Sequence, residues 1–144
     1  MSDAVLRKTS SEVRVRYSET DQMGFVYHAH YLVWCEIGRT DFMRELGVVY
    51  AEVERQGIRL VVSDAHVRFR TPARYDDLVR IDTHIERVQS RAVTFAYELL
   101  RVTDDPVRLA TASTTLLAID EHGSTRMLPP DLLAVFRVAR TGSQ

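Results

Sequence analysis

The chain has 144 residues, a formal net charge of -1 at pH 7, 45% hydrophobic residues and 27% charged residues. This length suffices for one domain with a hydrophobic core, so we predict a single domain over residues 1–144, with flexible ends at about 1–10 and 141–144. The near-neutral charge excludes the strongly basic surface typical of a nucleic-acid-binding protein. No stretch approaches the roughly 18 consecutive apolar residues of a membrane-spanning helix.

The start of the chain and its cysteine content indicate the compartment. Residues 1–10 are too polar for the apolar core of a signal peptide, and Cys35, the single cysteine, has no partner for an internal disulfide. We therefore expect the protein in a reducing cytoplasm. Lys8 is the one lysine among 19 basic residues. An excess of arginine permits a phosphorylated ligand, because arginine binds phosphate through two parallel hydrogen bonds, but a biased codon composition explains the same excess.

The predicted elements begin with a strand at residues 11–17, where apolar and polar side chains alternate. A loop separates this strand from a long helix at about residues 30–46, whose apolar residues recur at three- and four-residue spacing and which ends at Gly47. Apolar residues lie on more than one side of this helix, as in a helix that other elements surround. A second, short helix is predicted at residues 49–56.

The rest of the chain alternates as β-strands do. In a strand predicted at residues 58–70, the apolar positions change phase after Val62, which indicates a bulge or a sharp bend. The order of elements predicts an α+β fold in which a curved antiparallel sheet wraps one long helix. The remaining predicted elements are strands at residues 78–88, 92–103 and 107–120 and a helix at 131–139.

Residues 17–47 carry the most specific motif. Asp21 stands just ahead of a turn at Gly24 and of the long helix. A carboxylate in that place can act as a base or a nucleophile, and the free N–H groups at a helix start can stabilise negative charge on a carbonyl oxygen. The motif has the spacing Asp-x-x-Gly-x-Val-Tyr-His-x-x-Tyr, here Asp21, Gly24, Val26, Tyr27, His28 and Tyr31.

This motif closely resembles that of the hotdog-fold acyl-CoA thioesterases of the 4-hydroxybenzoyl-CoA thioesterase group, including the branch associated with the bacterial Tol-Pal system. The resemblance covers the whole chain in length and element order. A weaker similarity lies at residues 69–77, where the family commonly has a Pro-Ala-x-Tyr-x-Asp turn. The resemblance implies a single hotdog domain.

The resemblance also implies a role for each motif residue. Asp21 would be the catalytic carboxylate, either as general base on water or as a nucleophile that forms a mixed anhydride. The backbone N–H of His28 would polarise the thioester carbonyl, while its imidazole either contacts the substrate or Asp21, or merely caps the helix. Gly24 would allow a positive φ, Tyr27 carries over with the motif, and Tyr31 would pack or line the acyl pocket. Basic residues near strand ends would bind the CoA phosphates, and the candidates, otherwise solvated surface groups, are Arg68, Arg70, Arg74 and Arg91.

Two alternatives concern the long helix. Glu36 is a second candidate carboxylate, because another hotdog thioesterase branch carries its catalytic carboxylate on the central helix; we favour an ion pair between Glu36 and Arg39 instead. His28, His30 and Glu36 could suggest a metal site, but side chains two residues apart on a helix point to different faces, so we predict no metal. Cys35 is expected in the core.

We therefore predict an acyl-CoA thioester hydrolase without metal or redox cofactor, which acts on acyl-CoA or acyl-carrier protein. The resemblance implies a homodimer or homotetramer whose active sites are built from two chains. One alternative is a hotdog dehydratase, which would require a catalytic histidine and a Phe-Pro-Gly-type motif, and the sequence contains no Phe-Pro. The other is a non-catalytic acyl-CoA-binding protein. The sequence does not identify the acyl group.

Overall fold

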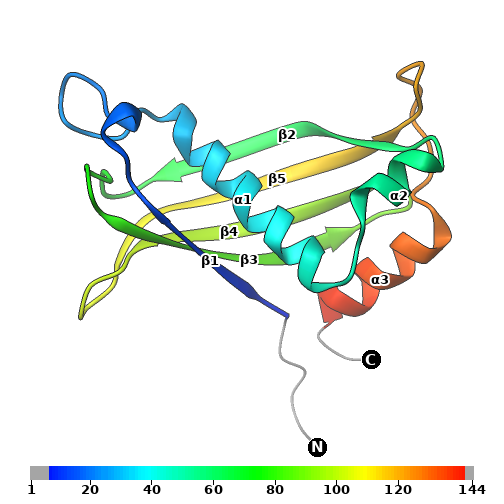
Figure 1. Cartoon of the computed structure of the whole chain (residues 1–144). Helices are drawn as coiled ribbons and strands as arrows, with labels where there is room; N and C mark the ends of the chain where they lie inside the picture. Colours follow the sequence, from blue (N-terminus) through cyan, green and yellow to red (C-terminus); the bar gives the residue numbers. More distant parts are fainter. Residues whose placement is uncertain (1–6, 142–144) are drawn as a thin grey trace, which may run out of the picture.

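The structure is a computed structural model that describes residues 7–141, so most of the predicted flexible ends lie outside the described residues. Its main layer is a five-stranded antiparallel sheet in the order β1-β3-β4-β5-β2, and the long helix α1 (Ala29–Glu45) lies across one face of it (Figure 1). This arrangement confirms the predicted α+β hotdog fold. The strands are β1 (Thr9–Arg14), β2 (Arg59–Phe69), β3 (Leu78–Val88), β4 (Ala92–Arg101) and β5 (Val107–Ile119).

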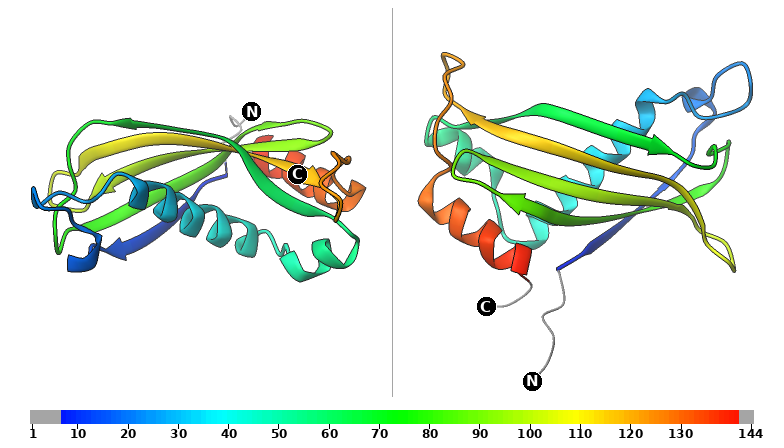
Figure 2. Two further views of the ribbon diagram at one scale, coloured as in Figure 1. Left: turned by 90° about the horizontal axis from the view of Figure 1, so that it is seen from above. Right: turned by 180° about the vertical axis from the view of Figure 1, so that it is seen from behind.

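One 3₁₀ turn and two further helices complete the fold of the described residues. They are the 3₁₀ turn η1 (Tyr17–Glu19), α2 (Tyr50–Arg55) and α3 (Pro130–Thr141). Figure 2 shows the sheet curving over α1, with α3 at the end of the sheet opposite the loop that leads into α1. The first predicted strand, residues 11–17, ends earlier than expected, because the chain turns into η1 at Tyr17. None of the helices within residues 7–141 is long and apolar enough to cross a membrane.

The core lies between α1 and the sheet. Trp34 and Phe42 on α1 and Phe95 on β4 are at most 1% exposed. Helix and sheet approach closely at Gly38, where an added Cβ would collide with Thr83 Oγ1 and lie 2.9 Å from Ile81 Cγ2. Gly38 is therefore required for contact between the two layers.

The curvature of the sheet is accompanied by register shifts. The pairing of β2 with β5 shifts between Val62 and Asp64, which confirms the irregularity predicted from the change of phase. A second shift, in the pairing of β3 with β4, lies between Ile85 and Arg87. Because β5 is the only sheet neighbour of β2 among the described residues, the other side of β2 is an open edge there.

Candidate active site

The loop between η1 and α1 is closed by hydrogen bonds to Asp21. Its N–H donates to the carbonyl of Phe25 (2.7 Å), and its Oδ1 accepts from the N–H groups of Met23 (2.9 Å) and Phe25 (3.2 Å). Gly24 has φ +83°, the positive value predicted for it, and an added Cβ would meet nothing within 4 Å. The requirement for glycine there is conformational. The loop thus fixes one oxygen of an exposed carboxylate and leaves Oδ2 without a partner in the described residues.

The start of α1 offers a free donor. His28 is the N-cap residue, and its carbonyl accepts from Tyr31 N–H (3.2 Å). Its own N–H donates no hydrogen bond within residues 7–141. The imidazole lies against the Tyr27 ring, with 4.4 Å between the ring centroids. An unpartnered N–H at the positive end of a 17-residue helix is suited to bind a developing oxyanion.

Asp21 and His28 line one cavity of about 300 Å³. Tyr31 from α1, Phe69 from the end of β2 and Arg70 line the same cavity. The ring centroids of Tyr31 and Phe69 are 4.9 Å apart, so these two side chains form part of its wall. The structure therefore brings together four of the predicted site residues, Asp21, His28, Tyr31 and Arg70.

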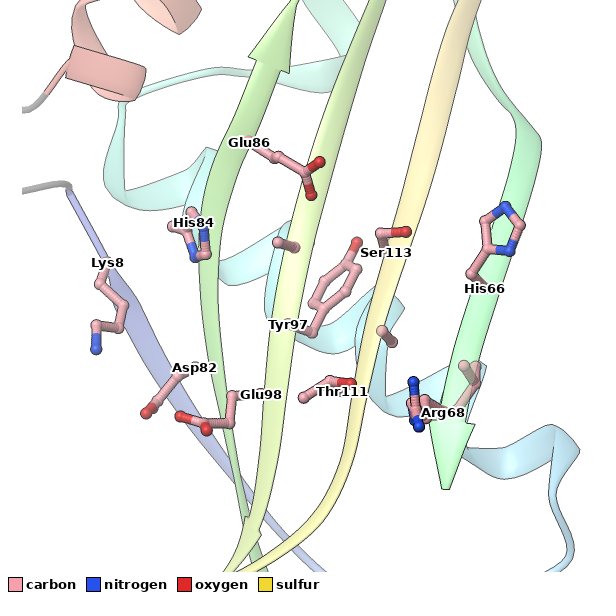
Figure 3. Close-up of a pocket in the computed structure, with 13 residues that line it drawn as sticks. Lys8, His66, Arg68, Asp82, His84, Glu86, Tyr97, Glu98, Thr111 and Ser113 are labelled. Atoms are coloured by element: carbon pink, nitrogen blue, oxygen red, sulfur yellow. The ribbon is translucent and has the colours of Figure 1, made fainter. Parts of the chain in front are cut away.

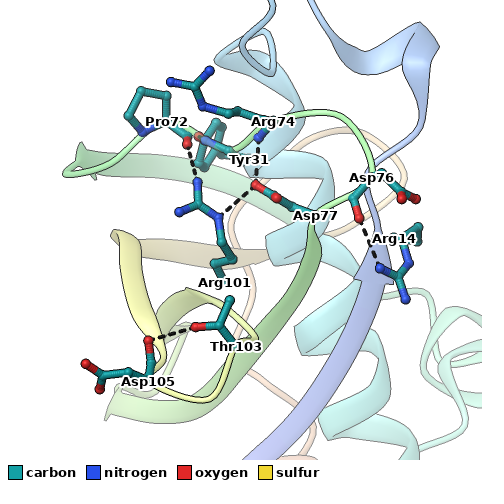
Figure 4. Close-up of polar contacts among 10 residues, drawn as sticks. Arg14, Tyr31, Pro72, Arg74, Asp76, Asp77, Arg101, Thr103 and Asp105 are labelled. Atoms are coloured by element: carbon teal, nitrogen blue, oxygen red, sulfur yellow. Dashed lines mark hydrogen bonds and ion pairs between the residues drawn. The ribbon is translucent and has the colours of Figure 1, made fainter.

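The connection between β2 and β3 borders this cavity, and a polar network fixes it (Figure 4). Arg101 on β4 donates through Nε to Asp77 Oδ2 (2.9 Å) and through its terminal nitrogen to the Pro72 carbonyl (2.9 Å). The N–H of Ala73 donates to the Tyr31 hydroxyl oxygen (3.0 Å). Burial raises the pKa of Tyr31, although the Ala73 hydrogen bond and the Arg101 charge act in the opposite direction. Tyr31 therefore remains a neutral phenol that ties α1 to this connection.

Glu19 is a buried carboxylate that the sequence analysis did not identify. It is 4% exposed; Oε1 accepts from the Arg16 N–H (2.8 Å), and Oε2 lies 3.4 Å from Trp34 Nε1 and 4.0 Å from His30 Nδ1. These contacts hold η1 against α1, so they fix both ends of the loop that carries Asp21. A signal was available, because a glutamate three residues after the end of an extended segment commonly bonds back to that backbone.

Five predicted residues do not line this cavity, and one of them is Gly24, which shapes the loop that carries Asp21. Tyr27 is 49% exposed beside the His28 ring. The backbone N–H of Arg74 donates to Asp77 (2.8 Å), and its guanidinium lies 4.9 Å from the Phe25 ring centroid. Arg91 lies in the turn between β3 and β4, which is at the other end of the sheet. Arg68 lines a different cavity, described next.

Another cavity, of about 680 Å³, lies on the opposite face of the sheet from α1 (Figure 3). Since Thr83 faces Gly38 on α1, the neighbouring Asp82 and His84 point to the other face. Charged side chains of both signs surround this cavity, and Arg68 is among them. The residues of the Asp21 motif do not line it.

Glu36 lines a third cavity, and Asp21 does not line that cavity. The predicted ion pair between Glu36 and Arg39 is wrong, because the ion pairs of the described residues on α1 do not include it; Arg44 there pairs with Asp41 (2.8 Å). Cys35 is fully buried, and burial raises the pKa of its thiol to about 12, so it is part of the core as predicted. Within residues 7–141 no three His, Cys, Asp or Glu side chains are grouped to hold a metal ion.

The similarity of this chain to known proteins extends over both the motif and the sheet. A family model described as thioesterase-like superfamily matches residues 15–136. The acyl-CoA thioesterase YbgC of Haemophilus influenzae is 32% identical over 112 residues, which are 77% of this chain and 80% of that protein. The acyl-CoA thioester hydrolase YbgC of Escherichia coli is 29% identical over 126 residues, 87% of this chain and 92% of that protein. The structure of a DHNA-CoA thioesterase from Staphylococcus aureus is 30% identical and superposes with a TM-score of 0.84, over 90% of this chain and 89% of that chain.

Proposed function

Since the chain belongs to the thioesterase-like superfamily, we propose that it is an acyl-CoA thioester hydrolase, which releases a carboxylic acid and CoA. The names of the relatives support this activity. The observation that carries the proposal is the cavity shared by the Asp21 carboxylate and the unpartnered N–H of His28. A thioester carbonyl between these two groups would meet a base or nucleophile on one side and a hydrogen-bond donor on the other.

Two routes use these groups. In the first, Asp21 takes a proton from water as the water oxygen adds to the carbonyl carbon; the C–S bond then breaks, and the departing CoA thiolate takes up the proton from Asp21. In the second, Asp21 itself attacks, expels the thiolate and forms a mixed anhydride that water then hydrolyses. In both routes the His28 N–H binds the carbonyl oxygen while it carries negative charge. Glu19 acts as a positioning residue through its contacts with η1 and α1.

Arg70 is the predicted arginine best placed for the CoA moiety, because it lines the Asp21 cavity and is exposed. The resemblance implies that Arg68, Arg74 and Arg91 also bind the CoA phosphates. These three arginines do not line the Asp21 cavity, so they would bind a phosphate outside it. We further propose a homodimer or homotetramer with shared sites, since β2 offers an open edge beside the cavity. The single, buried Cys35 fits a reducing cytoplasm. An acyl-carrier protein is an alternative carrier of the acyl group.

The experiment is a thiol-release assay of the purified full chain across aromatic, short-chain and long-chain acyl-CoA thioesters. We expect release of free CoA from at least one class, with an equal amount of carboxylic acid. Loss of water from hydroxyacyl-CoA without release of thiol would favour a dehydratase. Tight binding of acyl-CoA without either product would indicate a non-catalytic binding protein.

A further inference from the structure

Two neighbouring tyrosine side chains, Tyr17 and Tyr75, project into solvent. Tyr17 at the start of η1 is 77% exposed, and Tyr75 in the connection between β2 and β3 is 58% exposed. Their ring centroids are 5.8 Å apart, and the planes of the two rings are perpendicular. The two rings therefore form an aromatic corner that is open to solvent.

The aromatic corner is contiguous with the Asp21 cavity. Phe25 lines that cavity, and the guanidinium carbon of Arg74 lies 4.9 Å from the centroid of the Phe25 ring. Phe25 and Arg74 also pair through an isolated β-bridge, and Tyr75 follows Arg74 directly in the chain. From the cavity outward, the surface thus consists of Phe25, Arg74 and the aromatic corner.

Hydrogen bonds fix the backbone beneath both rings. The Tyr17 carbonyl accepts from the Thr20 N–H (3.1 Å) and from the Thr20 hydroxyl (2.7 Å). Directly after Tyr75, the Asp76 N–H donates to the Val15 carbonyl (3.0 Å). Because the backbone is already ordered, a flat ligand that stacks on these rings loses little affinity to the ordering of the protein.

Two arginines beside the aromatic corner have no acidic partner. Within residues 7–141, neither Arg14 nor Arg74 forms an ion pair with a carboxylate. Arg14 donates to the Asp76 carbonyl (3.0 Å), so both arginines border the turn at Asp76 (Figure 4). Guanidinium groups bind phosphate through paired hydrogen bonds, and aromatic rings stack on nucleobases. A ligand with a purine base and phosphate groups matches both features.

We propose that the aromatic corner binds the adenine ring of CoA and that Arg74 binds its diphosphate, so that this surface selects CoA over carriers of the acyl group that lack an adenine. This inference rests on the proposed function, because it assigns the far end of the substrate whose thioester Asp21 and His28 hold. Tyr17 and Tyr75 are specificity-determining residues in this scheme. The chemistry at the thioester remains with Asp21.

The length of CoA suits this placement. Its pantetheine arm has about as many bonds as a four-residue peptide, which spans about 14 Å when it is extended. With the thioester between Asp21 and His28, the arm passes Phe25 and brings the diphosphate to Arg74. The adenine, which is attached beyond the diphosphate, then reaches the aromatic corner.

The test compares kcat/KM for an acyl-CoA with kcat/KM for the acyl-pantetheine that carries the same acyl group but lacks the diphosphate and the adenine. The acyl group is the one that the thiol-release assay shows to be hydrolysed fastest. The wild-type chain should prefer the acyl-CoA. Tyr17→Leu should lower kcat/KM for the acyl-CoA by roughly 5- to 100-fold, the range of one base stacked on one ring, and should leave the acyl-pantetheine unchanged. Tyr17→Phe keeps the ring and should match the wild-type chain.

Arg74→Met and Arg55→Met form a matched pair. Arg74→Met should lower kcat/KM for the acyl-CoA alone, because the acyl-pantetheine has no phosphate. Arg55 is an exposed arginine of α2 that pairs with Glu52 (3.2 Å), so Arg55→Met should leave both substrates at their wild-type values. Circular dichroism must show that each variant is folded.

Three results would overturn the proposal. The wild-type chain hydrolyses the acyl-CoA and the acyl-pantetheine with equal kcat/KM, or folded Tyr17→Leu keeps the preference for the acyl-CoA. In the third, Tyr17→Leu lowers kcat/KM by the same factor for both substrates, which would place the role of Tyr17 at the loop and not at the adenine.

Calorimetry with CoA and pantetheine separates this proposal from the proposed function. If the chain hydrolyses no acyl-CoA, the proposed function fails, but titration of the intact chain with these two thiols still measures the contribution of the aromatic corner to Kd. Tighter binding of CoA than of pantetheine, lost in Tyr17→Leu and kept in Tyr17→Phe, would support the proposal. Equal Kd values, no binding of CoA by the wild-type chain, or an unchanged Kd for CoA in Tyr17→Leu would overturn it.

Discussion

At the scale of single residues, hydrogen bonds with the backbone hold the Asp21 carboxylate in place. The N–H groups of Met23 and Phe25 bind Oδ1, and the Phe25 carbonyl binds the Asp21 N–H. These contacts depend on the shape of the loop, which Gly24 allows through its positive φ. A change at Asp21 that keeps an acceptor oxygen should therefore leave the loop intact and alter only the charge.

Asp21→Asn tests whether the charge of Asp21 can be removed without a change in the loop. The amide retains an acceptor oxygen but cannot act as a base or nucleophile, so we expect thioester hydrolysis to fall by roughly 10²- to 10⁴-fold while the melting temperature is unchanged. Initial rates of thiol release and thermal melts measure both effects. Asp104→Asn, an exposed position in the turn between β4 and β5, is the control and should match the wild-type chain. Near-normal turnover in Asp21→Asn would refute the role of Asp21.

The burial of His84 lets us predict how the free energy of unfolding changes with pH. Burial lowers its pKa from the model-peptide value of 6.5; Glu86 opposes this effect and Lys8 adds to it. The folded protein thus disfavours the protonated imidazole. Its contribution to stability is complete above pH 6.5 and is lost as the pH falls through the lower, folded pKa.

Urea titrations at a series of pH values check this effect. The free energy of unfolding of the wild-type chain should fall as the pH drops below 6.5, and His84→Asn should show a smaller fall. His122→Asn is the control, because His122 is 80% exposed, and it should follow the wild-type curve. A wild-type slope in His84→Asn would assign the pH dependence to other groups.

Of the predicted residues that line the Asp21 cavity, three belong to the contiguous motif and one, Arg70, lies outside it. The motif predicted Asp21, Gly24 and His28 as neighbours, and the structure places the first and the last on one cavity. The contribution of Glu19 depends on contacts between η1 and α1, which no local spacing shows. The arginines were chosen by nearness to strand ends, and that criterion ignores which face of the sheet a side chain occupies.

At the scale of elements, α1 and β3 are in contact at Gly38. The side chain of Thr83 fills the space that a Cβ at Gly38 would need, and the Thr83 hydroxyl has no hydrogen-bond partner there. Glycine disfavours a helix by about 1 kcal/mol relative to alanine, so its presence in the middle of α1 is a local cost. The close approach of helix and sheet explains that cost.

Gly38→Ala should therefore destabilise the protein despite its better helix propensity. Overpacking in a dense core costs about 1–3 kcal/mol, and this exceeds the propensity gain when the clash involves a rigid β-branched side chain. Urea unfolding measures the change. In a double-mutant cycle, Thr83→Ala should relieve part of the loss, because it removes the colliding oxygen. Unchanged or higher stability of Gly38→Ala would show that the layers can separate at low cost.

The elements were predictable because their periodicity is strong. The strand at residues 78–88 has the predicted limits, and the change of phase after Val62 located the bulge. Residues 11–17 were assigned too far toward the C-terminus, because Tyr17 continues the alternating pattern although η1 begins there. The network of Arg101 with Asp77 could not be predicted, since it joins residues 24 positions apart, one at the end of β4 and the other in the connection between β2 and β3.

At the scale of the whole molecule, the open edge of β2 is unusual for a chain that acts alone. Val61, Val62 and Phe69 on this strand are 37%, 48% and 51% exposed. A long edge strand with apolar side chains tends to pair with another strand. A second copy of the chain would cover this edge and would place its own residues beside Phe69, which lines the Asp21 cavity.

We therefore predict that the active species is an oligomer paired through β2. Val62→Lys should weaken it, because a lysine on the strand edge opposes pairing, and dilution should then lower specific activity with the same midpoint as dissociation. Light scattering after size exclusion gives the mass, and thiol release at the same concentrations gives the activity. Met127→Lys, which changes an exposed apolar residue away from β2, is the control and should leave both curves unchanged. A fully active monomer, in the wild-type chain or in Val62→Lys, would show that each chain carries a complete site.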